Sequence, residues 1–166
     1  MPARTLISVE EYLRTSYRPD CDYVDGEVVE RNLGEWDHSS LQGAILVYLW
    51  NRYRKDGFIA VPEQRVQAKP ARFRIPDVCV VLREPGEKIL TKPPFVCIEV
   101  LSPEDRMSRV QQRINDYREM GVPYVWVLDP ETKQAYAATS DGLHEAKQIL
   151  TTENPRIELP LNEVFS

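Results

Sequence analysis

Two acidic residues, Asp77 and Glu99, stand in the two most apolar segments of the chain and are the first candidates for chemistry. Asp77 belongs to RIPDVCVV (residues 74–81), and Glu99 belongs to FVCIEVLSP (residues 95–103). Because an isolated ionised carboxylate is costly to bury, acids in such segments need a partner. Two neighbouring carboxylates can share a proton or hold a cation, and Mg²⁺ or Mn²⁺ takes oxygen ligands of this kind.

An antiparallel hairpin of strands 76–82 and 94–101 would bring the two acids together. If the pairing is symmetric about Lys88, opposed residues have numbers that add up to 176, and this holds for the two acids and for Cys79 and Cys97. Directly opposed residues have Cβ atoms roughly 4.5–5.5 Å apart. This spacing leaves two interpretations open: a metal site, or an aspartate that merely begins a strand and a glutamate paired with an arginine.

A helix is predicted over residues 104–120, directly after the second strand. Arg106, Arg109 and Arg113 form one stripe on it, beside an apolar stripe of Met107, Val110, Ile114 and Tyr117. Arginine binds phosphate bidentately, so the basic stripe could bind phosphate beside the acids. The alternative is a solvated helix face, which fits Arg106 and Arg109 better than Arg113.

His38 lies near the start of a second amphipathic helix, predicted over residues 37–54. It could face the acidic site or bind phosphate at the helix N-terminus. Alternatively, Asp37 is the N-cap and His38 is solvated.

The remaining pattern indicates one α/β domain of 166 residues. SVEE at residues 8–11 predicts a short helix to about residue 17, and Asp25-Gly26 and Asp141-Gly142 predict an N-terminal and a C-terminal hairpin. Residues 57–67 read as one strand interrupted at Pro62. The run at 123–130 reads as a buried strand that a crossover helix makes parallel to the strand carrying Glu99.

Composition narrows the function classes. The chain has 21 basic and 26 acidic residues and a formal charge of −5, which argues against nonspecific nucleic-acid binding by a broadly basic surface. Its three cysteines form no CxxC pair, and no apolar stretch reaches the roughly 20 residues that span a bilayer. We therefore expect a cytoplasmic protein that does not associate with membranes.

Three segments resemble the Uma-two family of the restriction-endonuclease-like PD-(D/E)xK nuclease superfamily. They are PDV at residues 76–78, IEVLSP at 98–103 and DYREMGVPYVWVLDP at 116–130, and the resemblance extends N-terminally to DYVDGEVVERN and HSSLQGAIL. It implies a restriction-endonuclease-like core, a mixed β-sheet flanked by helices, and a Mg²⁺ (or Mn²⁺) site.

The resemblance also implies residue roles. Asp77 and Glu99 match the motif acids that bind metal, with help from the carbonyl of Val100, and Asp22 stands near the site where the family usually has a glutamate. The superfamily lysine is replaced by Leu101, and the helical lysine thought to substitute for it in this family corresponds to Arg113. Arginine stays protonated, so it can stabilise charge on phosphate but is a poor general base.

The expected function is metal-dependent hydrolysis of DNA by an endonuclease in which Asp77, Glu99, Arg113 and Asp22 are catalytic. The alternative is a catalytically weakened nuclease fold that acts as a nucleic-acid-binding or regulatory module. Because cutting both strands of a duplex needs two sites, we also expect a homodimer.

Overall fold

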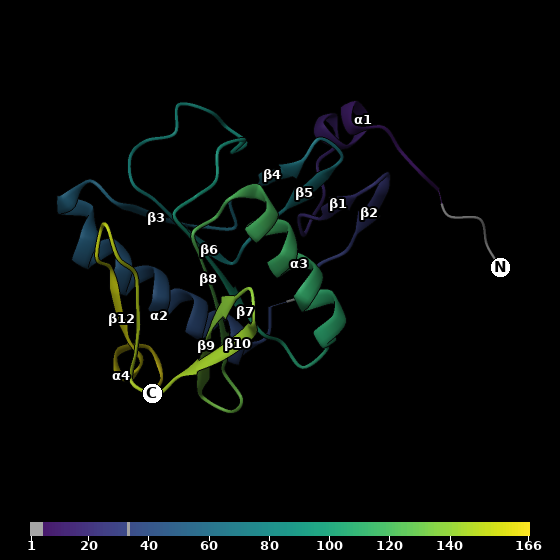
Figure 1. The fold of residues 1–166 in the computed structure, drawn as a ribbon. Coiled ribbons are helices and arrows are strands. Elements are labelled where there is room, and N and C mark those ends of the chain that lie inside the picture. The colour runs from purple at the N-terminus through teal and green to yellow at the C-terminus, as the bar shows by residue number, and fades with distance from the viewer. Residues whose placement is uncertain (1–4, 33) are drawn as a thin grey trace.

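The computed structural model describes residues 5–32 and 34–166. A six-stranded sheet forms its centre, in the order β10-β9-β8-β7-β6-β3 (Figure 1). Its strands are β3 (Ile59–Pro62), β6 (Val78–Val81), β7 (Val96–Val100), β8 (Tyr124–Asp129), β9 (Gln134–Thr139) and β10 (Gly142–Ala146). Only the β7–β8 pair is parallel in the described sheet, so the predicted mixed sheet is confirmed.

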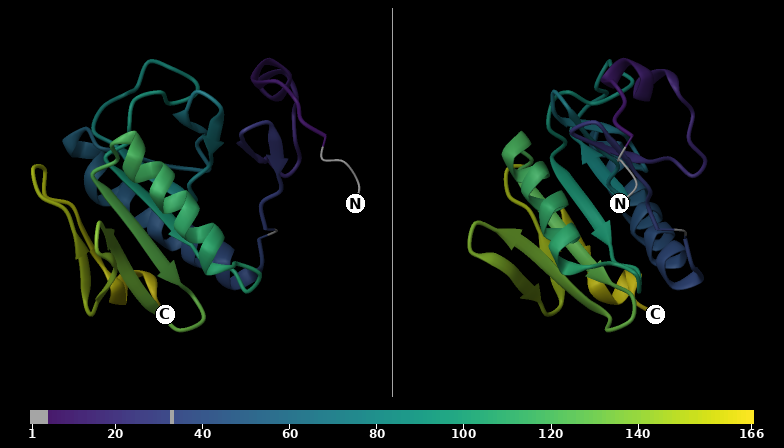
Figure 2. Two further views of the ribbon diagram at one scale, coloured as in Figure 1. Left: turned by 45° about the vertical axis from the view of Figure 1, so that its right-hand side comes forward. Right: turned by 90° about the vertical axis from the view of Figure 1, so that its right-hand side faces the viewer.

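A long helix covers each face of this sheet, as the right-hand view of Figure 2 shows. These are α2 (Trp36–Tyr53) on one side and α3 (Met107–Met120) on the other. Helix α2 begins one residue before the predicted start, and its N-cap is Glu35 rather than Asp37. Helix α3 ends at Gly121, whose φ of 104° gives the left-handed cap that glycine adopts without strain.

Two smaller sheets flank the centre. A four-stranded sheet in the order β2-β1-β5-β4 lies with α1 (Val9–Arg14) at one end of the molecule (Figure 1). Its strands are β1 (Asp22–Val24), β2 (Glu27–Val29), β4 (Val66–Lys69) and β5 (Arg72–Arg74). The C-terminal part contains β11 (Ile149–Thr151), β12 (Glu158–Pro160) and α4 (Leu161–Val164), and a short 3₁₀ helix, η1 (Arg54–Asp56), follows α2.

One predicted strand is wrong. Residues 57–67 do not form a single interrupted strand, because β3 joins the six-stranded sheet and β4 joins the four-stranded sheet. Pro62 ends β3, and the next residue, Glu63, has a φ of 50°, which turns the chain away from the first sheet. Helix α1 is also shorter than predicted, since it ends at Arg14.

The predicted register of the central hairpin is confirmed. Strands β6 and β7 pair antiparallel, with Cys79 opposite Cys97 and Val78 opposite Ile98. Side chains alternate between the two faces of a strand. Ile98 accordingly packs in the core on the α2 side, whereas Cys97 packs in the core on the α3 side. Glu99, two residues after Cys97, points to the same side as Cys97.

Candidate active site

Asp77 and Glu99 lie at the same end of the β6–β7 hairpin and line one cavity of about 850 Å³. Asp77 immediately precedes β6, and Glu99 is the fourth residue of β7. The two residues are 3% and 4% exposed, so both carboxyl groups are almost wholly removed from bulk water. Since burying a charge is costly, each needs the close partners that the structure provides.

Among residues 5–32 and 34–166, three groups contact the carboxylate of Asp77. The backbone N–H of Val100 donates to Oδ2 at 2.7 Å, and the guanidinium of Arg31 donates to Oδ1 at 3.1 Å. His38 Nε2 lies 3.4 Å from the same Oδ1. The hydrogen bond to Asp77 raises the pKa of His38 against the lowering effect of burial.

Helix α2 brings His38 to the site because its apolar residues Leu41, Ile45 and Leu49 fix that face of the helix against the sheet. The side chain of His38 is 15% exposed, so the solvated alternative does not hold. One turn further along the helix, Gln42 donates to the main-chain carbonyl of Asp77 at 2.8 Å.

Two residues of helix α3 contact the carboxylate of Glu99. The hydroxyl of Tyr117 donates to Oε1 at 2.5 Å, and Arg113 Nε lies 3.5 Å from Oε2. Residues four apart share one helix face, and this spacing directs both side chains to the same acid. Burial raises the pKa of Glu99 to about 7; Arg113 opposes the rise, and the neighbouring charge of Asp77 adds to it.

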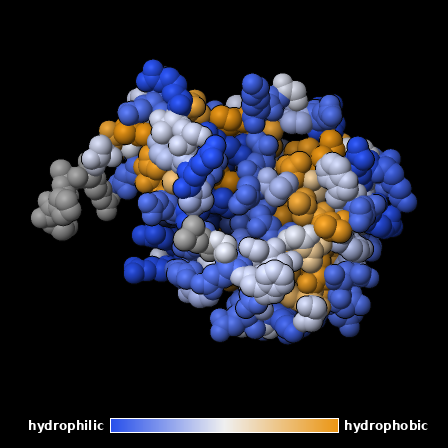
Figure 3. All heavy atoms as spheres, turned by 180° about the vertical axis from the view of Figure 1, so that it is seen from behind, coloured by the Kyte–Doolittle hydropathy of each residue, from blue (hydrophilic) through white to orange (hydrophobic). Residues whose placement is uncertain are grey.

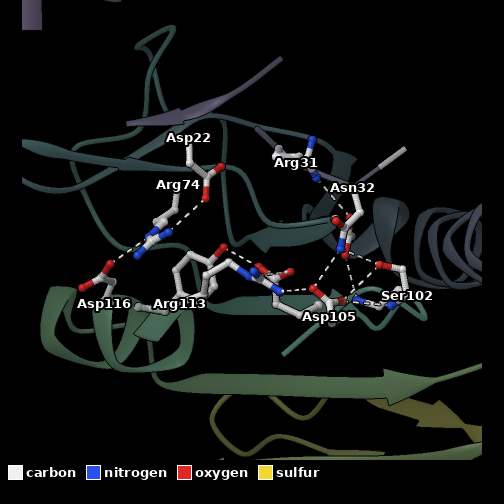
Figure 4. A network of polar contacts seen from close by, with 12 residues as sticks. Asp22, Arg31, Asn32, Arg74, Ser102, Asp105, Arg113 and Asp116 are labelled. Carbon is white, nitrogen blue, oxygen red and sulfur yellow. Dashed lines mark hydrogen bonds and ion pairs between the residues drawn. The ribbon is translucent and has the colours of Figure 1, made fainter. Parts of the chain in front are cut away.

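Arg113 also joins the acid site to the loop before α3. Its Nη2 lies 3.3 Å from Asp105 Oδ1, and Asp105 accepts hydrogen bonds from Ser102 and Asn32 (Figure 4). Asn32 donates to the hydroxyl of Ser102 as well, at 2.8 Å. This network ties the chain after β2 to the chain after β7 at the cavity wall.

Asp22 lies in a second buried network. Its Oδ2 accepts from Arg74 at 3.1 Å, and Arg74 also donates to Asp116 of α3 (Figure 4). The other oxygen, Oδ1, is buried without a hydrogen-bond partner among the described residues. Burial raises the pKa of Asp22, and Arg74 opposes that rise.

The basic stripe of α3 borders the cavity as predicted. Arg106, Arg109 and Arg113 all line it. Arg106 and Arg109 are exposed, and their side chains make no hydrogen bond or ion pair with any residue that the structure describes. They are free to meet an anion from solvent, whereas Arg113 is already paired with acids.

The donor chemistry of the cavity fits a hard divalent cation. The carboxylates of Asp77 and Glu99 and the carbonyl of Val100 are oxygen ligands, and Asp22, whose buried Oδ1 has no hydrogen-bond partner among the described residues, lines the same cavity. Within the described residues no three His, Cys, Asp or Glu form a complete cage for a metal ion. Mg²⁺ commonly binds one or two carboxylates and fills its remaining positions with water and phosphate oxygens.

Arg31 and Tyr117 contact the acids but were not singled out as functional residues from the sequence. Arg31 lies 46 positions from Asp77, and no periodicity connects the two. The sequence places Tyr117 in the apolar stripe of α3, where its ring does pack, while its hydroxyl reaches Glu99. Its spacing of four from Arg113 was the available signal.

Comparisons with known proteins agree with this architecture. A solved structure described as "a putative nuclease belonging to DUF820", from Anabaena variabilis ATCC 29413, is similar with a TM-score of 0.81. The alignment covers 96% of this chain and 97% of that chain at 18% sequence identity, which shows a shared restriction-endonuclease-like fold. No curated protein matches the chain.

Among the described residues no helix is both long and apolar enough to cross a membrane.

The model of the Uma2 family, described as "Putative restriction endonuclease", matches residues 9–165, which is nearly the whole sequence. The chain therefore belongs to the Uma2 family of restriction-endonuclease-like proteins.

Proposed function

We propose that the protein is a metal-dependent endonuclease that hydrolyses phosphodiester bonds of DNA. The observation that carries the proposal is the pair of buried acids, Asp77 and Glu99, that face a cavity bordered by unpaired arginines. The acids suit a divalent cation, and the arginines suit the phosphates of a nucleic acid. Family membership supports the same reaction class.

Asp77, Glu99 and the carbonyl of Val100 would hold Mg²⁺ or Mn²⁺. Such an ion supplies activation of water and neutralisation of charge on the phosphate. Tyr117 and the Val100 N–H orient the two carboxylates, because each donates to one of them.

The basic residues act on the phosphate. Arg106 and Arg109 bind flanking phosphates at the mouth of the cavity. Arg113, held beside Glu99, stabilises the negative charge that develops on the scissile phosphate. Asp22, which lines the same cavity, would assist through a water molecule bound to the metal.

The test is cleavage of supercoiled plasmid DNA and of a labelled linear duplex in the presence of Mg²⁺ or Mn²⁺. Asp77→Asn and Glu99→Gln should each reduce the rate by at least about a hundredfold, since each removes charge from the site. Asp141→Asn and Glu163→Gln make the same changes at exposed positions outside the cavity and should leave the rate unchanged. Cleavage that continues at full rate in excess chelator would overturn the proposal.

A second candidate is a nucleic-acid-binding or regulatory module with weakened chemistry. The observation that favours it is Arg113, which occupies the position beside Glu99 where the family resemblance implies a lysine. Fluorescence anisotropy with labelled duplex separates the two candidates. Binding that depends on Arg106 and Arg109, without cleavage under any metal condition, supports the module.

A further inference from the structure

Helix α2 carries a second stripe of residues on its solvent side. Its core stripe consists of Leu41, Ile45, Leu49 and Tyr53. The solvent-side stripe has the alternating spacing of four and three that forms a seam between two packed helices, and it continues one residue beyond the helix. We call it the outer seam: Trp36, Ser40, Gly43, Val47, Trp50 and Arg54.

The outer seam carries three large apolar side chains that are exposed to solvent. Trp36 is 82% exposed, Val47 is 58% exposed and Trp50 is 37% exposed. Figure 3 shows an orange patch among hydrophilic residues on the side of the molecule that α2 covers, and Val47 is the one residue of the outer seam at the orange end of its scale, since tryptophan lies near the middle. Single exposed apolar residues are ordinary, but a seam of them along one helix indicates a contact surface.

Gly43 lies at the middle of the outer seam, with Trp36 seven residues before it and Trp50 seven residues after it. A Cβ added at Gly43 would meet no atom within 4 Å, so the surface there is open. An antiparallel copy of α2 whose two-fold axis passes beside Gly43 would place each Trp36 opposite Trp50 of the other copy. The absence of a side chain at the axis lets the two helices approach closely.

A groove lies at one end of the outer seam, and the exposed side chain of Trp36 lies at the other. Trp50, Asn51, Arg54 and Lys55 line a shallow groove at the C-terminal end of α2. In the antiparallel arrangement this groove faces Trp36 of the other copy. The Arg54 guanidinium already lies over the Trp50 ring, 4.8 Å from its centroid, and a second indole can join that stack.

The two ends of the outer seam are complementary in charge. Glu35 and Asp37 stand at the N-terminal end of α2, and Arg54 and Lys55 stand just beyond its C-terminal end. An antiparallel pair brings the acidic end of each helix to the basic end of the other. The helix dipoles oppose each other in the same arrangement, which is favourable.

We propose that two copies of this chain form a two-fold symmetric dimer through antiparallel packing of the outer seams of α2. The surface is self-complementary, as a closed two-fold interface requires. In this dimer each Trp36 lies in the groove at the C-terminal end of the other copy's α2. The two tryptophans then contribute most of the binding energy, as hot-spot residues of an interface do. The inference is independent of the nuclease proposal, because it uses neither the acids nor the phosphate-binding residues.

The first test is sedimentation equilibrium of the whole chain, without nucleic acid, over a wide range of protein concentration. The wild type should show a reversible monomer–dimer equilibrium. Trp36→Ala should raise the dissociation constant at least about thirtyfold, as expected for a tryptophan hot spot. Leu13→Ala removes another exposed apolar side chain, on α1, and should leave the equilibrium unchanged.

The second test locates the two-fold axis. In the proposed dimer, residue 43 of one copy faces residue 43 of the other at the two-fold axis. Mild oxidation of Gly43→Cys should therefore give a covalent dimer in high yield. Ser108→Cys places an exposed thiol on α3 as the matched control and should give no covalent dimer, and the three native cysteines are buried. Circular dichroism and thermal unfolding establish that each variant is folded.

A wild type that stays monomeric at every concentration would overturn the proposal, and so would open filaments. A dimer that tolerates Trp36→Ala, or that crosslinks equally through positions 43 and 108, would show that another surface is used. Selective crosslinking at position 43 together with loss of dimer in Trp36→Ala would establish the outer seam as the interface.

Discussion

Arg31 donates a hydrogen bond to Asp77 Oδ1 at 3.1 Å, so a resident cation already contacts the acid that the proposed metal would use. Burial lowers the pKa of Arg31, but the carboxylates of Asp77, Asp22 and Glu99 raise it by more. The guanidinium is therefore charged, and it neutralises part of the acid cluster in the absence of a divalent ion. Arg31 also reaches Glu63, at 3.4 Å, on the exposed side of the site.

Replacing Arg31 by glutamine should raise the affinity for Mn²⁺ in the absence of DNA by about tenfold or more. The substitution removes a positive charge that repels the ion and competes for Asp77 Oδ1. Isothermal titration calorimetry measures the effect directly and requires no knowledge of the substrate. Arg156→Gln, which removes an exposed arginine paired with Glu153 and Glu158, is the charge-matched control. Equal affinity of wild type and Arg31→Gln for Mn²⁺ would show that the guanidinium of Arg31 does not compete with the metal ion for Asp77.

Replacing Arg113 by lysine should increase the rate of DNA cleavage by at least about tenfold. Lysine keeps a cation beside Glu99 but can change its protonation state, whereas arginine cannot. Plasmid nicking under single-turnover conditions measures the chemical step. Arg109→Lys provides the same change on the rim of the cavity and should alter the rate little. A slower Arg113→Lys enzyme would mean that the bidentate guanidinium is itself the required group.

Local pattern was sufficient to predict the centre of the fold. The symmetric placement of two apolar runs about Lys88 gives the observed β6–β7 register, including the Cys79–Cys97 pair. The Asp25-Gly26 turn has positive φ at both residues, 51° and 98°, as a two-residue hairpin of this type requires. These features depend on residues that are close in sequence.

Long-range partners were not predictable in the same way. Arg31 reaches Asp77 because the chain after β2 crosses to the end of β6. No pattern in the sequence links these two positions, so the contact could not be predicted. Strand β5 was missed because its three residues alternate Arg-Phe-Arg. Arg74 is buried and Arg72 is half-buried, and both are paired with aspartates that lie far away in the sequence: Asp22, Asp25 and Asp116. The sequence of a short charged strand resembles that of a loop, and it can be recognised as a strand only when the acidic partners of its arginines are known.

Replacing Asp116 by alanine should lower the free energy of unfolding by about 3–5 kcal/mol, the usual cost of leaving a buried charge without its partner. Asp116 is 1% exposed and accepts hydrogen bonds from Arg74 and Arg72, both at 2.8 Å. Without it, the buried Arg74 keeps only Asp22 as an acidic partner in the described part of the chain. Urea denaturation measures the loss. The adjacent Asn115 is exposed, so Asn115→Ala should cost less than about 1 kcal/mol. Equal losses in the two variants would show that the Arg74 network contributes nothing specific.

Glu99 should make the metal-free protein less stable as the pH rises towards neutrality. Its pKa is about 7 in the folded protein, against an ordinary value of 4.5, mainly because it is buried. Between these values the folded state binds more protons than the unfolded state does. The stabilisation from this group is complete below pH 4.5 and is lost as the pH rises through about 7.

The expected loss between pH 4.5 and pH 8 amounts to roughly 2–3 kcal/mol from this carboxyl group. Glu99→Gln cannot ionise, so its free energy of unfolding should fall less over this range than that of the wild type. Glu163→Gln, at an exposed position, should follow the wild type. The measurement is urea denaturation in chelator at half-unit steps of pH. His38 acts in the same direction in every variant, because its raised pKa also favours the folded state at low pH. The charge of Glu99 is the smallest of the causes that raise the pKa of His38, so most of the difference between the curves comes from Glu99 itself. Parallel curves for wild type and Glu99→Gln would mean that Glu99 is ionised throughout and that Arg113 compensates its burial in full.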